Sequence, residues 1–196
     1  MNRIILIAAI GIITLFSTQG HAADWAVDQS HSSLNFKTKH LVFTTVRGTF
    51  DEFEGTVSLD PGDLSTIQAA FTAQIASINT DNDGRDEHLR GSDFFDAEHH
   101  PTMTFQSKMA RQTAPGKAEL TGDLTIRGVT KEVTFMVDGF HQSIDFMGTT
   151  KIGGIATATI NRQDFGVSWN RTLDNGGLVV SDNVDIEIEL ELDKQN

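Results

Sequence analysis

Apolar and polar residues alternate along several segments of this chain. In the longest of them, near the C-terminus, each of Val184, Ile186, Ile188, Leu190 and Leu192 is followed by an acidic residue. Successive side chains of a β-strand point to opposite faces of the sheet, so this pattern predicts a strand with one apolar and one solvated face. Similar patterns occur at 34–40, 53–59, 69–78, 103–109, 117–126, 133–137 and 155–161. The chain is therefore predicted to contain about eight strands.

Turn-forming residues lie between these segments. Pro61-Gly62 and Pro115-Gly116 suit the two central positions of a type II turn, and Asn175-Gly176-Gly177 can adopt positive φ. Regular strands joined by short turns, without long helices between them, predict an all-β antiparallel sandwich or barrel.

The alternation stops between Asp83 and Pro101. Asp83 is a candidate N-cap and Gly91 a candidate helix end, which predicts a short helical insertion near residues 84–97. Leu89, Phe94 and Phe95 would give this insertion an apolar side.

The N-terminus has the pattern of a secretory signal peptide. Arg3 is followed by an apolar run from residue 4 to 16, and small residues at Gly20 and Ala22 predict cleavage after Ala22. The run is too short to span a bilayer, which needs about 20 apolar residues. We therefore expect a signal peptide at 1–22, one domain at 23–196, a periplasmic location and no stable membrane insertion.

Composition excludes several classes of function. The formal net charge is −12 and becomes more negative when Arg3 is removed, which opposes binding to nucleic acids and to anionic membrane surfaces. The chain has no cysteine, so disulfides and thiol chemistry are excluded.

Motifs for catalysis or metal binding are incomplete. Asp28, His31 and Ser32 have the residue types of a catalytic triad, but neighbours on an extended chain point to opposite faces. His88, His99 and His100 lie in an acidic segment without a recognised metal-ligand spacing, which favours a solvated loop. No catalytic residue, metal site or cofactor is predicted, apart from a bound lipid as ligand.

The aromatic composition leaves room for an apolar ligand. The chain has 13 phenylalanines and 2 tryptophans but no tyrosine, so most of its rings carry no hydrogen-bonding group. The interior of an eight-stranded barrel is either filled by side chains or wide enough for one small ligand. Small residues are expected to face inward at Ala69, Ala73, Gly122, Ala156 and Ala158.

The order of short motifs resembles the YceI-like family of periplasmic proteins. The first half contains Asp28-x-x-His31-Ser32, Phe36, His40, Gly48-x-Phe50, Phe53-x-Gly55 and Ser77-Ile78-Asn79-Thr80. The second half contains Arg85-Asp86-x-His88-Leu89, Asp93-Phe94-Phe95-Asp96, Pro101-x-Met103-x-Phe105-x-Ser107, Gly122-x-Leu124-Thr125-Ile126-Arg127-Gly128-Val129-Thr130-Lys131 and Asn161-Arg162-x-Asp164-Phe165-Gly166. Arg127 stands where the family often has histidine.

The resemblance implies a lipocalin-like barrel that binds a polyisoprenoid or a similar long apolar chain. The ligand-binding candidates in the lumen are Phe36, His40, Phe50, Phe53, Phe94, Phe95 and Phe105. Each of these side chains can belong either to a packed core or to a cavity wall, because a barrel interior can be filled or hollow.

Three functions remain open at this point. The leading hypothesis is a non-enzymatic protein that transports, stores or sequesters a long-chain lipid such as a polyisoprenoid, an isoprenoid quinone or a fatty acid. An enzyme acting on such a lipid would need His31 or His40 to meet Asp28 in the lumen. A binding module for a membrane redox or stress partner would use an acidic face, but the sequence shows no exposed apolar patch for it. A homodimer also stays open.

Overall fold

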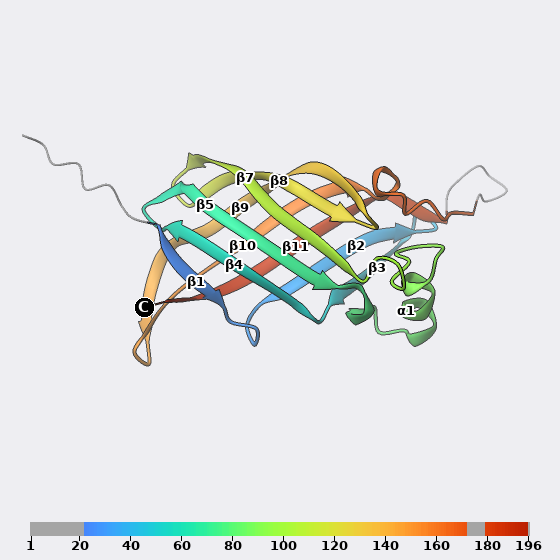
Figure 1. Ribbon diagram of the computed structural model, residues 1–196, viewed down its shortest axis with the longest axis horizontal. Coiled ribbons are helices and arrows are strands. Elements are labelled where there is room, and N and C mark those ends of the chain that lie inside the picture. The colour runs from blue at the N-terminus through green and yellow to red at the C-terminus, as the bar shows by residue number, and fades with distance from the viewer. Residues whose placement is uncertain (1–21, 172–178, 196) are drawn as a thin grey trace, which may run out of the picture.

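A computed structural model describes residues 22–171 and 179–195 (Figure 1). Eleven strands form one antiparallel sheet, with one α-helix and two short 3₁₀ helices. The elements are β1 (Ala23–Val27), β2 (Ser33–His40), β3 (Thr44–Phe50), β4 (Phe53–Asp60), β5 (Asp63–Gln74), η1 (Ile75–Ser77), β6 (Ile78–Asn79), α1 (Asp83–Arg90), β7 (Thr102–Ala114), β8 (Lys117–Ile126), β9 (Val129–Phe146), β10 (Thr149–Asn161), η2 (Arg162–Phe165) and β11 (Val180–Lys194).

Eight of these strands close into a barrel. Their order is β1-β4-β5-β7-β8-β9-β10-β11, and β11 pairs back to β1. Closure removes the exposed sheet edges that an open sheet would leave. The predicted antiparallel, lipocalin-like barrel with a helical insertion is confirmed.

The long strand β11 has two partners on the same side. Its C-terminal end pairs with β1, where Val27 lies opposite Leu192, and its preceding part pairs with β2, where Phe36 lies opposite Ile186. Strands β3 and β6 extend the sheet beyond β2. The wall near α1 is therefore built from β2, β3 and β6, and the wall at the far end from β1.

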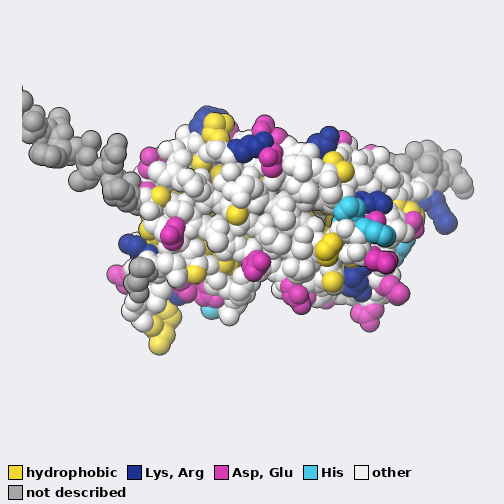
Figure 2. Space-filling model, viewed as in Figure 1, with side chains coloured by type: hydrophobic (Ala, Val, Ile, Leu, Met, Phe, Trp, Pro, Cys, Tyr) yellow, Lys and Arg dark blue, Asp and Glu magenta, His cyan; other side chains and the backbone are white. Residues whose placement is uncertain are grey.

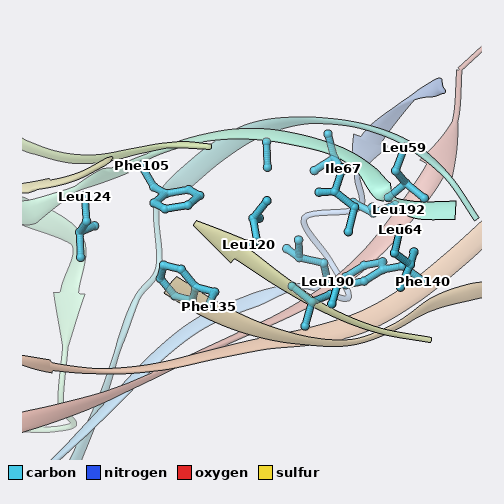
Figure 3. Packing of buried hydrophobic residues seen from close by; sticks show 14 of the residues in the cluster. Leu59, Leu64, Ile67, Phe105, Leu120, Leu124, Phe135, Phe140, Leu190 and Leu192 are labelled. Carbon is cyan, nitrogen blue, oxygen red and sulfur yellow. The ribbon is translucent and has the colours of Figure 1, made fainter. Parts of the chain in front are cut away.

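The end of the barrel at β1 is closed by large apolar side chains. Trp25, Leu59, Leu64 and Leu192 are buried, and the indole Nε1–H of Trp25 donates a hydrogen bond to the Leu59 carbonyl at 3.2 Å. Figure 3 shows the three leucines clustered at one end of the core, next to Leu190 and Phe140. Their packing leaves the α1 end as the candidate entrance.

Helix α1 lies at the other end of the barrel (Figure 1). Its N-cap is Asn82, whose side chain accepts a hydrogen bond from the Arg85 N–H at 2.9 Å, so the prediction of Asp83 as the cap was wrong by one residue. The buried Asp86 carboxylate accepts from the Thr80 N–H at 3.0 Å and so ties α1 to the end of β6. The helix ends at Gly91, as predicted.

Several local predictions differ from the structure. The sequence patterns missed β1 and β3, and the segment 69–78 contains the end of β5 followed by η1 and β6. Gly116 has the positive φ that a type II turn requires, at 71°, whereas the φ of Gly62 is not positive. The predicted turn at 175–177 lies outside the described residues.

The predicted signal peptide lies almost entirely in residues 1–21, outside the described part of the chain. Within the described ranges, no helix has the length and apolar character needed to cross a bilayer.

Candidate functional site

Three apolar cavities follow one another inside the barrel, with volumes of about 40, 50 and 100 Å³. The first and second cavities share four wall residues, Phe71, Phe105, Phe135 and Ile188. The second and third share another four, Leu34, Met103, Ile126 and Ile186. Because neighbouring cavities have walls in common, the three form one interrupted apolar lumen.

Two phenylalanines form the constriction between the first and second cavities. The rings of Phe105 on β7 and Phe135 on β9 meet edge to face, with their centroids 5.1 Å apart. Figure 3 shows the two rings facing each other across the interior. A chain longer than one cavity would have to move these rings.

Glycines on the barrel wall allow other phenylalanine rings to lie flat. Gly55 on β4 is paired with Phe71 on β5, and Gly48 on β3 is paired with Phe36 on β2. A Cβ atom would lie 2.3 Å from the Phe71 ring at Gly55 and 2.5 Å from the Phe36 ring at Gly48. The absence of a side chain on the wall therefore keeps these rings out of the centre of the lumen.

We expect Gly55→Ala to push the Phe71 ring into the lumen. Overpacking of this kind typically costs about 1 to 3 kcal/mol in the free energy of unfolding, measurable by urea denaturation. Gly84→Ala in α1 is the control, because its added Cβ would lie 3.8 Å from Asn82 Oδ1, an ordinary contact distance. Equal stability of the two variants would contradict the role given to Gly55.

The third cavity is covered by aromatic residues near α1. Phe94 and Phe95 follow the helix and line this cavity, and the Phe94 ring packs on Trp169 at a centroid distance of 5.2 Å. His88 on α1 meets both Phe94 and Trp169 edge to face, at 4.9 and 5.3 Å. These rings join α1 to the segment after η2 over the entrance.

A buried arginine fixes the segment that carries Trp169. Arg162 on η2 is 5% exposed and lines the third cavity. Its guanidinium donates to the carbonyls of Val167 (2.6 Å), Trp169 (2.9 Å), Ser181 (3.0 Å) and Val180 (3.4 Å), and to the Asp182 carboxylate (3.3 Å). These bonds use its five N–H groups, so Arg162 supports the backbone at the entrance and has none to spare for a ligand head group.

Six of the seven predicted lumen residues lie on the cavity walls. Phe36, Phe50, Phe94 and Phe95 line the third cavity, Phe53 lines the second, and Phe105 lines the first and second. His40 ends β2 and lies outside the walls of all three cavities. Ligand binding by these residues stays a prediction.

Sequence reasoning did not select several of the wall residues. They are Leu34, Phe71, Met103, Phe135, Ile186 and Ile188. All of them occur in the segments with alternating polarity, so the signal was present. The candidates were instead chosen from the motifs of the family resemblance, which contain other phenylalanines.

Comparison with known proteins places this barrel in a family. The YceI-like domain matches residues 25–192. The chain belongs to the YceI-like family. A UPF0312 protein of Staphylococcus aureus is 38% identical over 169 residues, which are 86% of this chain and 96% of that protein.

Solved structures of similar shape include two with closer sequences. Burkholderia cenocepacia BcnA is 27% identical with a TM-score of 0.71, over 84% of this chain and 98% of that one. A Campylobacter jejuni YCEI protein is 32% identical with a TM-score of 0.71, over 81% and 90%. A polyisoprenoid binding domain from Saccharophagus degradans is 18% identical with a TM-score of 0.64, over 89% and 100%, which shows a shared fold.

Arg127, where this YceI-like chain departs from the family pattern, lies in the turn between β8 and β9. Its guanidinium donates to the carbonyls of Gly166 and Ser92 at 2.7 and 2.9 Å. The hairpin end is thereby bonded to both segments that cover the entrance of the lumen.

The residues considered for catalysis in this YceI-like protein lie outside the lumen walls. His31 Nδ1 is 2.9 Å from Asp28 Oδ2, and the Ser32 hydroxyl bonds instead with the Glu191 backbone. Lys151 Nζ lies 3.1 Å from Asp28 Oδ2 and 2.8 Å from Glu191 Oε1. The cluster sits on the outward face of β10 and β11, so the meeting of histidine and aspartate inside the lumen that an enzyme hypothesis required does not occur.

Three residues of this cluster have the geometry of a cation site. Ligand atoms of Asp28, His31 and Glu191 lie within 4.8 Å of one another. The Lys151 ammonium contacts both of these carboxylates and also Asp193 at 2.7 Å. The lysine ammonium therefore already supplies the positive charge beside these carboxylates, so the cluster is an ion-pair network centred on Lys151.

The His31–Asp28 pair predicts a pH dependence. The hydrogen bond from His31, with a further one from Lys151, lowers the pKa of Asp28 to about 2, and the same Asp28 bond raises the pKa of His31 above 6.5. The contribution of His31 to stability is therefore complete below pH 6.5 and is lost as the pH rises through its folded-state pKa. The contribution of Asp28 is present above pH 3.8 and is lost as the pH falls towards 2.

NMR titration of the imidazole measures this directly. We expect the pKa of His31 to lie above 6.5 in the unmodified protein and to fall in Asp28→Asn, which lacks the negative charge. A pKa of His31 that is unchanged in Asp28→Asn would rule out the pairing.

Proposed function

We propose that this protein binds a long apolar lipid chain in the lumen of its barrel, and that it transports, stores or sequesters this lipid in the periplasm. Suitable lipids are polyisoprenoids, isoprenoid quinones and fatty-acid-like chains. The observation that carries the proposal is the row of three apolar cavities with shared walls. A linear chain of repeated apolar units fits such a row better than a compact ligand does.

The energy of transfer is sufficient for useful affinity. Burial of about ten methylene equivalents gives about 8 kcal/mol, at about 0.8 kcal/mol each, which corresponds to a micromolar complex before the costs of association. Longer isoprenoid chains would add to this value. Length and apolar shape would therefore provide most of the recognition.

Binding requires the side chains between the cavities to move, because the separate volumes are small. Met103 lies between the second and third cavities and has an unbranched, flexible side chain that can change its shape at low cost. Phe105 and Phe135 would have to turn aside between the first and second cavities. The lumen is thus partly filled by side chains, and the lipid would replace contacts between them.

The relatives are consistent with this proposal. The Saccharophagus degradans domain of the same fold is described as polyisoprenoid binding. The apolar lumen of the present chain supplies an independent physical reason for a similar ligand class. The predicted signal peptide and the family resemblance support a periplasmic site of action.

Native mass spectrometry of protein purified without added lipid tests the proposal. We expect an additional mass that organic extraction removes, and uptake that grows stronger with chain length in a series of polyprenols. A protein that carries no such mass and takes up none of the polyprenols would refute lipid binding. A polyprenol whose mass changes during incubation would instead support the enzyme hypothesis.

A further inference from the structure

The turn between β2 and β3 exposes two apolar side chains. Val42 and Phe43 are 69% and 86% exposed, although no exposed apolar patch was expected from the sequence. Leu41 and Val42 also have positive φ values, of 51° and 68°. This backbone conformation is unfavourable for a β-branched residue such as Val42, so the fold maintains the apolar tip at a cost in stability.

The outward face of the same hairpin is basic. Lys37, Lys39 and Arg47 are exposed, and Lys37 lies directly opposite Arg47 in the β2–β3 register. Like charges in this arrangement are destabilising, even though Lys37 also has Asp185 at 3.9 Å on its other side. Residues 29–50 contain no acidic residue, in a chain with 27 acidic and 15 basic residues.

The tip lies beside the entrance of the lumen. Phe36 and Thr38 of β2 line the third cavity, and the Leu41 N–H donates to the Val179 carbonyl at 2.9 Å, next to another residue of this cavity, Val180. Strand β2 continues for two residues beyond Thr38, or about 7 Å at about 3.3 Å per residue, and the tip follows its end at His40. Any apolar surface that buries this tip would therefore lie against the entrance of the lumen.

We infer that the β2–β3 hairpin, with Val42 and Phe43 at its tip and Lys37, Lys39 and Arg47 on its outward face, docks the entrance of the lumen on an anionic lipid bilayer. Phe43 and Val42 enter the boundary between head groups and acyl chains, and the three cations contact anionic head groups. Salt screens the repulsion from acidic residues that lie more than about 8 Å away. Asp185, which is 3.9 Å from Lys37, lies within that range, so Lys39 and Arg47 carry most of the attraction to the head groups. Docking of this kind is reversible and places a bilayer lipid next to the third cavity.

A second hairpin also exposes apolar side chains and can be compared with the β2–β3 hairpin. The β9–β10 hairpin exposes Ile144, Phe146 and Met147, but it carries Asp145 and no basic residue at its tip. It projects from the end of the barrel opposite α1 (Figure 1), and apolar atoms are visible there at the lower left of Figure 2. That end is closed by Trp25 and the leucines, so contact there would not expose the lumen.

Sedimentation with lipid vesicles tests the docking surface. We expect the protein to bind vesicles of phosphatidylcholine mixed with phosphatidylglycerol more strongly than vesicles of phosphatidylcholine alone. Phe43→Ser should weaken binding about tenfold, because it removes the apolar anchor, and Lys39→Glu at least about fivefold. The matched variant Phe146→Ser should bind like the unmodified protein.

The inference is overturned if the unmodified protein does not bind the anionic vesicles, or if Phe43→Ser binds as well as Phe146→Ser. Its role in lipid exchange rests on the proposed function, which native mass spectrometry tests separately. Phe43→Ser should retain as much lipid as the unmodified protein and yet transfer a fluorescent polyprenol between vesicles more slowly. Absence of retained lipid in every variant would refute the proposed function, while the vesicle result alone decides the docking.

Discussion

Replacement of Arg162 by methionine is expected to lower the free energy of unfolding by about 3 to 5 kcal/mol, the usual cost of breaking a buried charged network. The arginine is 5% exposed and donates to four backbone carbonyls. Methionine keeps an unbranched apolar stem but has no donor, so these carbonyls would lose a partner at the entrance of the lumen. The urea midpoint should fall by about 2 M, for an unfolding slope of about 2 kcal/mol/M.

The control for this substitution is Arg47→Met on the outward face of β3, which should change stability by less than about 0.5 kcal/mol. Amide hydrogen exchange gives a second measurement. In Arg162→Met, exchange should increase first between residues 163 and 171, because two of the four carbonyls, those of Val167 and Trp169, belong to the segment over the third cavity. Equal stability of Arg162→Met and Arg47→Met would contradict the anchoring role.

Replacement of Ala156 by phenylalanine is expected to weaken lipid retention strongly. Ala156 on β10 lies on the wall of the first cavity, between Val137 and Ile188 in the register. The added ring would enter the first cavity and overpack its wall, at a cost of about 1 to 3 kcal/mol in stability. A lipid chain would then have no room at this end of the lumen.

The neighbouring residue offers a matched control for this prediction. Thr157 follows Ala156 on the same strand and points to the opposite face. Thr157→Phe should therefore leave the mass of bound lipid unchanged in native mass spectrometry. Loss of lipid in Thr157→Phe, with full retention in Ala156→Phe, would place the ligand on the outside of the barrel.

The sequence allowed most of the barrel to be predicted, because alternating polarity is a direct consequence of strands with one buried face. The same criterion failed for β1, which has only five residues, and for β3, in which polar and apolar residues do not alternate. The predicted number of about eight strands agrees with the barrel partly because two errors in the prediction cancel. It included β2, which extends the sheet beside β11, and omitted β1, which closes the barrel.

The site was predictable to a smaller extent. Phenylalanines in the family motifs did lie on the cavity walls, but contacts between distant strands determine which residues share one cavity. Phe105 and Phe135 meet across the interior, and no local pattern indicates this pairing. The exposed Val42 and Phe43 were also missed, because a sequence does not show that a turn lifts apolar side chains away from the core.

The most direct test of the central claim is a crystal structure of the protein loaded with a polyprenol. We expect continuous ligand density from the third cavity near Phe94, past Met103, to the first cavity, with the Phe105 and Phe135 rings turned aside. Density confined to the outer surface, with all three cavities unchanged, would contradict it.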